Sequence, residues 1–184
     1  NVVSVINTTS KLEQYYEETH YRYLKISRKR SLSFSSALKL AKIIDENNID
    51  VIHMHWTKDL PIAVMAKVMS KKKPKLVQTR NMTMTRFKDD FYHRFLYKNI
   101  DGILAVTDQV KNQIEKFIPS DIRPKTQVLY IGAEQPVLIS PQMRKERREQ
   151  LGLNDSFCVG IVGRIELPKG QHIVLEAVKS LTVM

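Results

Sequence analysis

Short apolar runs alternate with amphipathic helical segments along most of the chain. This alternation is typical of a parallel sheet with helical crossovers, because such a sheet is covered on both faces and its strands read as apolar runs. In the helical segments apolar residues recur three or four positions apart, as in Val110, Ile114 and Phe117. We therefore predict an α/β fold with a doubly wound parallel sheet. The expected strands are 2–6, 23–26, 50–55, 75–80, 101–106, 126–131 and 157–162, and helices are expected to begin near residues 33, 60, 89, 108 and 170.

The composition is that of a globular protein without disulfides. Of the 184 residues, 42% are hydrophobic and 27% are charged, which is enough apolar material for one or two domains. The single cysteine, Cys158, excludes a disulfide framework and a cysteine metal cluster, and it lies in a run that we expect to be a buried strand. The sequence shows no secretion signal and no apolar run of about 18 residues. We therefore expect a cytoplasmic protein.

The charge favours a polyanionic partner. Lys and Arg total 30 against 19 Asp and Glu, a net charge of +11, and nucleic acid, anionic lipid and nucleotide all attract such a chain. A basic nucleic-acid-binding module is thus one alternative. However, the sequence has no RNP-like, KH-like or zinc-finger pattern and no strand-borne aromatic platform. We therefore expect no nucleic-acid partner.

Two glycines and two cations mark a strand-to-helix junction near the C-terminus: Gly163, Arg164, Lys169 and Gly170. A helix is expected to start near Gly170, so its first unpaired amides and the positive end of its dipole attract an anion. Arg164 offers a bidentate fork and Lys169 a point charge, a combination that suits a diphosphate. A loop whose cations merely face water is the alternative.

From this junction outward, the sequence resembles glycosyltransferase family 4, whose retaining enzymes have two Rossmann-like domains in the GT-B architecture. The family's second domain opens with a similar strand, Gly-Arg, short loop, Lys-Gly and helix. Three further segments resemble the family in the same order: 50–55, which ends in His-x-His, 99–107 and 128–134. The resemblance extends from about residue 33 to the end of the chain.

The resemblance implies a glycosyltransferase of polysaccharide biosynthesis that moves a sugar from a nucleotide-diphosphate donor to a glycan or lipid-linked acceptor. It implies that Gly163, Arg164, Lys169 and Gly170 hold the donor diphosphate. Two cations and a helix dipole can neutralise much of a diphosphate, so we expect no metal requirement and no cofactor besides the nucleotide sugar. A non-catalytic GT-B relative that serves as a scaffold is the other alternative.

The resemblance also divides the chain. It implies an acceptor-side Rossmann-like domain over residues 1–131, an interdomain linker over 132–142, and the start of a donor-binding domain over 143–184. The linker is expected because its segment has two prolines and no periodicity. A doubly wound domain needs several strand–helix units, and the family's glycine-rich start and Glu-x7-Glu segment are not found. We therefore expect a fragment that does not transfer sugar by itself.

Two histidines end an expected strand of the first domain. His53 and His55 are two residues apart, so they point to the same face of a strand, and open α/β sheets bind ligands at the carboxyl ends of strands. His55 is nearer that end and is a candidate catalytic residue, whereas His53 also fits a satisfied core histidine. Two histidines without a third ligand do not make a metal site.

The next expected strand ends in Arg80 and Asn81. In the family, the corresponding strand commonly ends in a histidine that lines the sugar-transfer site, and Asn81 stands at the aligned position as the second catalytic candidate. Asparagine can hydrogen-bond a sugar hydroxyl but cannot move a proton near neutral pH, which argues against acid–base catalysis there. Arg80 and Arg86 flank the following loop and are candidates for an acceptor phosphate, with solvated arginines as the alternative.

Phe87, Phe91 and Phe95 recur at every fourth position, surrounded by four cations: Arg86, Lys88, Arg94 and Lys98. A helix with this pattern can lie on an anionic bilayer, with its rings at the headgroups and its cations towards the lipid phosphates. The alternative is that the phenylalanines pack on the sheet. The first interpretation predicts a peripheral protein on the inner face of the plasma membrane.

Overall fold

The computed structural model of the chain describes residues 2–27 and 33–181. It divides into two compact units, Asn1–Gly132 and Ala133–Met184. The division falls at the start of the segment that the sequence suggests as a linker. The outer limits of the two expected domains, residues 1 and 184, lie outside the described residues.

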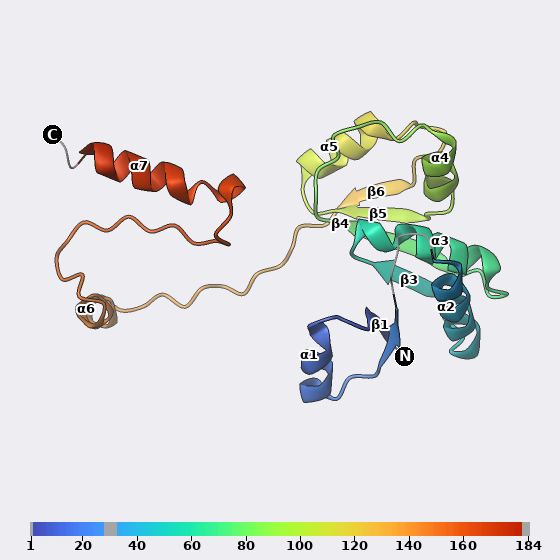
Figure 1. The fold of residues 1–184 in the computed structure, drawn as a ribbon, viewed down its shortest axis with the longest axis horizontal. Coiled ribbons are helices and arrows are strands. Elements are labelled where there is room, and N and C mark those ends of the chain that lie inside the picture. Colours follow the sequence, from blue (N-terminus) through green and yellow to red (C-terminus); the bar gives the residue numbers. More distant parts are fainter. Residues whose placement is uncertain (1, 28–32, 182–184) are drawn as a thin grey trace. The chain divides into compact units, whose positions relative to one another are not determined.

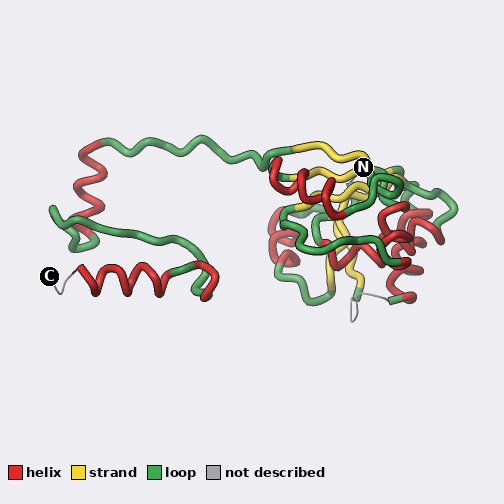
Figure 2. The backbone as a smooth tube through the Cα atoms, turned by 90° about the horizontal axis from the view of Figure 1, so that it is seen from above, coloured by secondary structure: helices red, strands yellow, loops and turns green. Residues whose placement is uncertain are grey.

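Parallel strands alternate with helices in the first unit (Figure 1). The strands form two sheets, and every pairing is parallel. The smaller sheet consists of β1 (Ser4–Asn7) and β2 (Tyr23–Ile26), and the larger one has the order β3 (Val51–Met54), β4 (Lys75–Arg80), β5 (Gly102–Ala105), β6 (Lys125–Val128). The helices are α1 (Leu12–Thr19), α2 (Phe34–Glu46), α3 (Leu60–Met69), α4 (Phe91–Lys98) and α5 (Asp108–Phe117), with a 3-10 turn, η1 (Thr57–Asp59), before α3. The predicted α/β fold with parallel strands is confirmed, and Figure 2 shows the strands running beside one another.

The register of the larger sheet decides which side chains face the core. Along β4, Leu76, Gln78 and Arg80 are buried and share one face, whereas Val77 and Thr79 point to the other face and are half-buried. Helices α3, α4 and α5 close the core over the first face. Its members come from all of these elements: Met54, Leu60, Val64, Leu76, Leu96, Tyr97, Ile103, Val110 and Ile114. Burial of this apolar surface, at about 25 cal/mol per Å², is the main stabilising contribution.

Helix α2 joins the smaller sheet to this core. Ala41 and Ile44 of α2 pack with Ala66 of α3. On the other side, the Ser36 hydroxyl donates to the carbonyl oxygen of Ser27 at 2.6 Å, and the Lys39 ammonium donates to that of Lys25 at 3.0 Å. The helix thus contacts both β2 and α3, through a small apolar cluster of its own.

Side-chain caps explain why three helices begin close to the predicted residues. Ser33, Asp90 and Thr107 accept hydrogen bonds from backbone amides in the first turns of α2, α4 and α5, which satisfies donors that otherwise lack a partner. Two helices, α1 and α6 (Pro141–Gln150), were not predicted. Neither has a buried residue, and α6 also lacks the apolar stripe by which helices are recognised.

The second unit contains helices, and none of its described residues forms a strand. The buried strand predicted at 157–162 is therefore wrong: the side chains of Phe157 and Val162 are almost fully exposed, and Cys158 is exposed too. A parallel strand needs a partner for its backbone N–H and C=O groups, and the described part of this unit offers none. The predicted helix start near Gly170 is confirmed, because a 3-10 turn, η2 (Leu167–Lys169), leads into α7 (Gln171–Leu181).

Candidate functional site

Two histidines and a threonine lie together at the carboxyl ends of β3 and β4. The His53 and His55 rings have centroids 4.4 Å apart, and His53 Nε2 lies 2.7 Å from Thr79 Oγ1. Both histidines are exposed, so they do share a face, and the alternative of His53 as a core residue is wrong. Desolvation and the neighbouring His55 lower the pKa of His53. Its imidazole is therefore neutral near pH 7 and able to donate or accept a hydrogen bond.

Arg80 and Asn81, which are adjacent at the end of β4, differ in burial. Asn81 is exposed, whereas Arg80 lies on the helix-covered face with only 7% of its surface exposed. The alternative that Arg80 is solvated is therefore wrong, whereas its role toward an acceptor phosphate stays a prediction. Successive residues of a strand point to opposite faces, which is why these two neighbours differ. Arg86, farther along the loop, is exposed.

Two hydrogen bonds join the loop 81–90, which follows β4, to α5. The amide of Met84, a buried residue, donates to Gln113 Oε1 at 2.7 Å, and the amide of Lys88 donates to the carbonyl oxygen of Phe117 at 2.9 Å. The guanidinium of Arg80 contacts the same loop at the carbonyl oxygen of Thr83, 3.4 Å away. The loop therefore has a defined position over the end of β4.

Three polar residues at this end of the sheet were not among the predicted site residues. Thr79 is hydrogen-bonded to His53, and Thr57 of η1 accepts hydrogen bonds from both Gln78 and Arg80. Gln78 is fully buried. The available signal was the position of Gln78 two residues after Leu76, on the same face of the strand, because buried polar side chains require hydrogen-bond partners.

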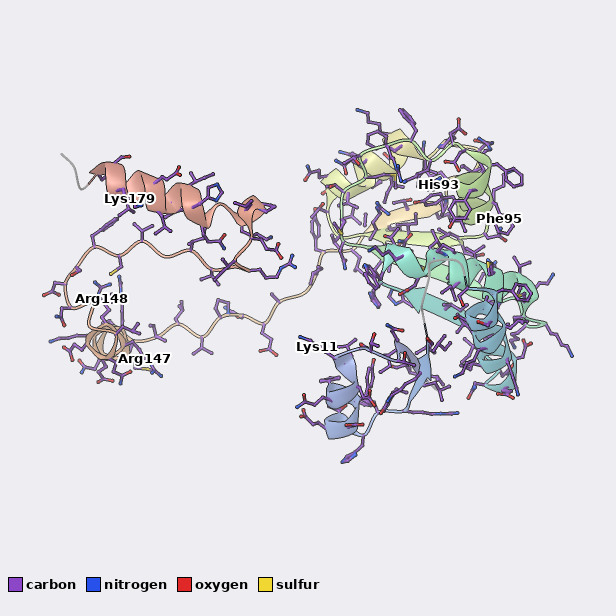
Figure 3. All side chains as sticks on the ribbon, viewed as in Figure 1. Lys11, His93, Phe95, Arg147, Arg148 and Lys179 are labelled. Atoms are coloured by element: carbon purple, nitrogen blue, oxygen red, sulfur yellow. The ribbon has the colours of Figure 1, made fainter. Side chains whose placement is uncertain are left out.

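The aromatic residues near α4 do not form one helical stripe. Helix α4 begins at Phe91, so Phe87 precedes it, and the Phe87 ring packs edge-on against Phe117 with 5.2 Å between centroids. Phe91 is 89% exposed and Phe95 42%; Figure 3 labels Phe95 on α4. The alternative that these rings pack on the sheet is thus wrong for Phe91. Arg94 forms ion pairs with Asp89 and Asp121, which removes it from the set of cations available to lipid.

The glycine-rich junction of the second unit folds as a tight turn in front of α7. Gly170 has φ +75°, a conformation that glycine adopts without strain. Gln171 Nε2 donates to the carbonyl oxygen of Arg164 at 2.7 Å, so the first residue of α7 holds the turn. Arg164 Nη1 lies 3.0 Å from Glu166 Oε1, with the arginine side chain 78% exposed. Lys169 is exposed as well.

Neither a metal cluster nor a membrane span is evident in the described residues. Within residues 2–27 and 33–181, no three His, Cys, Asp or Glu side chains come together in a way that would hold a metal ion. None of the helices described there has the length and apolar character needed to cross a bilayer.

Comparison with known proteins places this arrangement in a family. Residues 1–108 match the family model described as "Glycosyl transferase 4-like", whereas no curated protein matches. The structure of Anabaena Alr3699/HepE in complex with UDP is similar, with a TM-score of 0.71 and 19% identity over 95% of this chain and 49% of that chain. For the same protein with UDP and glucose, the TM-score is 0.68 and the identity 18%, with the same coverage. The chain thus spans about half the length of these structures, which share its fold. Because the family model covers more than half of its residues, the chain belongs to the Glycosyl transferase 4-like family.

Proposed function

We propose that the protein carrying this chain is a glycosyltransferase, which moves a sugar from a nucleoside-diphosphate donor to a glycan or lipid-linked acceptor in polysaccharide biosynthesis. The family match over residues 1–108 carries the proposal. The shared fold of Alr3699/HepE, solved with UDP and with UDP and glucose, supports a uridine-diphosphate sugar as the donor.

The donor diphosphate is assigned to the turn before α7. Its amides and the positive end of the α7 dipole attract an anion, and Arg164 and Lys169 add two full charges beside it. Gly163 and Gly170 bound the turn, and at each of them a side chain would meet a neighbour only at van der Waals distance. An added Cβ on Gly163 would lie 3.7 Å from Gln171 Nε2, and one on Gly170 would lie 3.8 Å from Ile173. Glu166 pairs with Arg164 at 3.0 Å, and the diphosphate would replace this exposed pair.

Catalysis in this proposal rests on positioning and electrostatics. When the bond between the sugar and the diphosphate oxygen breaks, negative charge grows on the leaving diphosphate. Arg164, Lys169 and the amides of the turn stabilise that charge, and this step calls on no metal ion.

The acceptor is assigned to the carboxyl ends of β3 and β4. His55 and Asn81 are exposed there, and each can hydrogen-bond a sugar hydroxyl. Of these two, only the histidine has a ring nitrogen that can accept a proton. Any transfer of the acceptor's proton to a side chain at this edge is therefore assigned to His55, and Asn81 is assigned to orientation.

A transfer assay tests the function. The full-length protein, given UDP-glucose labelled in the sugar, should release UDP and label a glycan or polyprenyl-phosphate-linked acceptor. UDP binding without transfer to any acceptor would favour the scaffold alternative. Binding to random single-stranded nucleic acid that weakens steeply with salt, with no response to UDP, would favour the nucleic-acid-binding alternative.

We also propose that the protein is cytoplasmic and contacts the inner face of the plasma membrane through α4. Phe91, Phe95 and Lys98 lie three or four residues apart, so they share one face of the helix. Phe91 and Phe95 are exposed, and Lys98 is exposed beside them. Exposed aromatic rings next to a cation suit the headgroup region of an anionic bilayer.

Vesicle binding tests this contact. Phe91→Ser should weaken binding to anionic vesicles about tenfold, because burial of an aromatic side chain contributes about 1.5–3 kcal/mol, and Lys98→Glu should weaken it through charge. Binding should also fall as salt rises above about 0.15 M, where screening acts beyond about 8 Å. Phe34→Ser is the matched control, since Phe34 is 62% exposed on α2. Equal binding to neutral vesicles, or an unchanged Phe91→Ser variant, contradicts the contact.

A further inference from the structure

Arg80 is a buried cation without an acidic partner among the described residues. Its Nη1 donates to Thr57 Oγ1 at 3.5 Å and its Nη2 to the carbonyl oxygen of Thr83 at 3.4 Å. Both distances are at the outer limit for a hydrogen bond. Its Nε is buried and has no hydrogen-bond partner in the structure, and no ion pair involving Arg80 occurs in residues 2–27 and 33–181. The guanidinium of Arg80 has five N–H donors but makes only two hydrogen bonds among the described residues, both of them long.

The side chain next to it on the same face is also incompletely paired. Gln78 is fully buried, its Nε2 donates to Thr57 Oγ1 at 3.2 Å, and its Oε1 has no partner. Gln78 and Arg80, both buried, thus form a polar cluster with the exposed Thr57, and this cluster offers both donors and an acceptor. A buried charge is costly unless an opposite charge or strong hydrogen bonds compensate it. This cluster is suited to a group that has a negative charge and a hydroxyl.

The surroundings add positive charge. Lys88 is half-buried, and its pKa is lowered by burial and then by Arg86 and Arg80, which shows that three cations lie near one another. The acid that acts on Lys88, Asp90, already accepts hydrogen bonds from the backbone and ring of His93. The loop that carries Lys88 is fastened to α5. The excess positive charge is therefore held in place over the end of β4.

We propose that Thr57, Gln78 and Arg80 bind an anionic group of the acceptor, a phosphate or a sugar carboxylate with a neighbouring hydroxyl. The oxyanion takes the guanidinium donors of Arg80 and displaces the Thr83 carbonyl oxygen, since charged acceptors bind a guanidinium more strongly than neutral ones. The neighbouring hydroxyl donates to Gln78 Oε1. Lys88 and Arg86 draw the anion to the loop. The identity of the ligand as the acceptor rests on the proposed function, whereas the binding site does not.

Ligand titrations of the full chain test the site. The single tryptophan, Trp56, directly precedes Thr57, so its fluorescence reports on the cluster. Inorganic phosphate and either glucose 6-phosphate or glucuronate should change the fluorescence and raise the melting temperature, whereas glucose and sodium chloride of equal ionic strength should not. The better of the two anionic sugars identifies the ligand as a phosphate or a carboxylate.

Two variants and a control decide the outcome. Arg80→Met keeps an unbranched apolar stem without the charged guanidinium and should fold, and it should weaken anion binding at least about tenfold. If it does not fold, Lys88→Gln should give a smaller loss in a folded chain. Arg22→Met is the control, since Arg22 donates to Asn47 Oδ1, at the C-terminal cap of α2. The inference is overturned if the unaltered chain does not respond to the anions, or if its response survives these variants.

The result is independent of the transfer assay. A protein that shows Arg80-dependent anion binding but transfers no sugar contradicts the proposed function alone. A protein that transfers sugar but shows no such binding contradicts this inference alone.

Discussion

Replacing Asp101 with asparagine is expected to lower the free energy of unfolding of the first unit by about 2–3 kcal/mol at pH 7. Asp101 lies just before β5 and joins three segments. Its carboxylate accepts hydrogen bonds from the amide of Leu76 at 2.8 Å and from the ammonium groups of Lys67 and Lys75. The Lys67 and Asp101 side chains are only 16% and 26% exposed, so water replaces these bonds poorly.

The lowered pKa of Asp101 decides how the stability effect of this substitution depends on pH. Burial opposes ionisation of Asp101, but hydrogen bonds from Lys67, Leu76 and Lys75 outweigh it and lower the pKa from 3.8 to about 2. A folded-state pKa below the unfolded value means that the stabilisation is fully present above about pH 4 and is lost as the pH falls through about 2. The difference between the unaltered chain and Asp101→Asn should therefore shrink over this range.

Urea unfolding followed by Trp56 fluorescence measures both effects, because Trp56 is the single tryptophan and lies in the first unit. Asp50→Asn is the matched control. Asp50 pairs with Lys72 at 3.1 Å, but its side chain is 77% exposed, and such pairs contribute about 0–1 kcal/mol. The account is wrong if Asp101→Asn costs no more than Asp50→Asn, or if its effect is the same at pH 7 and pH 2.

The larger sheet illustrates which parts of the fold can be predicted from sequence. The ends of β3, β4 and β5 lie within one residue of the expected ones, because each strand contains a short apolar run and is followed by a helix. The segment 157–162 has the same apolar character but forms no strand. The difference lies in pairing: an apolar run predicts burial only where neighbouring strands satisfy its backbone. Such neighbours are remote in sequence, so the pattern of the segment itself does not reveal them.

The site shows a similar limit. The common face of His53 and His55 follows directly from their spacing, and the structure places their rings together. The burial of Arg80 depends on which face of β4 the helices cover, a fact set by the crossovers between strands. Sequence alternation separates Arg80 from Asn81 but does not say which of them faces the core. The pairing of Arg94 with Asp121, 27 residues away, likewise arises only from the tertiary fold.

Removing both cations of the turn before α7 is expected to weaken UDP binding to the full-length protein about 50-fold, with Arg164→Ala and Lys169→Ala each weakening it about five- to tenfold. Each cation should contribute less than a fully shielded charged hydrogen bond, because Arg164 is 78% exposed and partly neutralised by Glu166. Uridine lacks the diphosphate, so all variants should bind it as the unaltered protein does. Arg147→Ala is the control, since Arg147 is an exposed cation on α6 of the same unit (Figure 3).

A substitution of Glu166 tests the same site, with the opposite expected effect on UDP affinity. Its carboxylate holds the Arg164 guanidinium at 3.0 Å, and a bound diphosphate must compete with it for the same donors. Glu166→Gln should therefore tighten UDP binding by up to about fivefold, since an exposed pair contributes at most about 1 kcal/mol. It should leave uridine binding unchanged.

Calorimetric titration with UDP and uridine separates these effects. Equal loss of UDP and uridine affinity in Arg164→Ala and Lys169→Ala would show that the turn supports the fold of the second unit rather than the diphosphate. Unchanged UDP affinity in both variants would place the donor elsewhere.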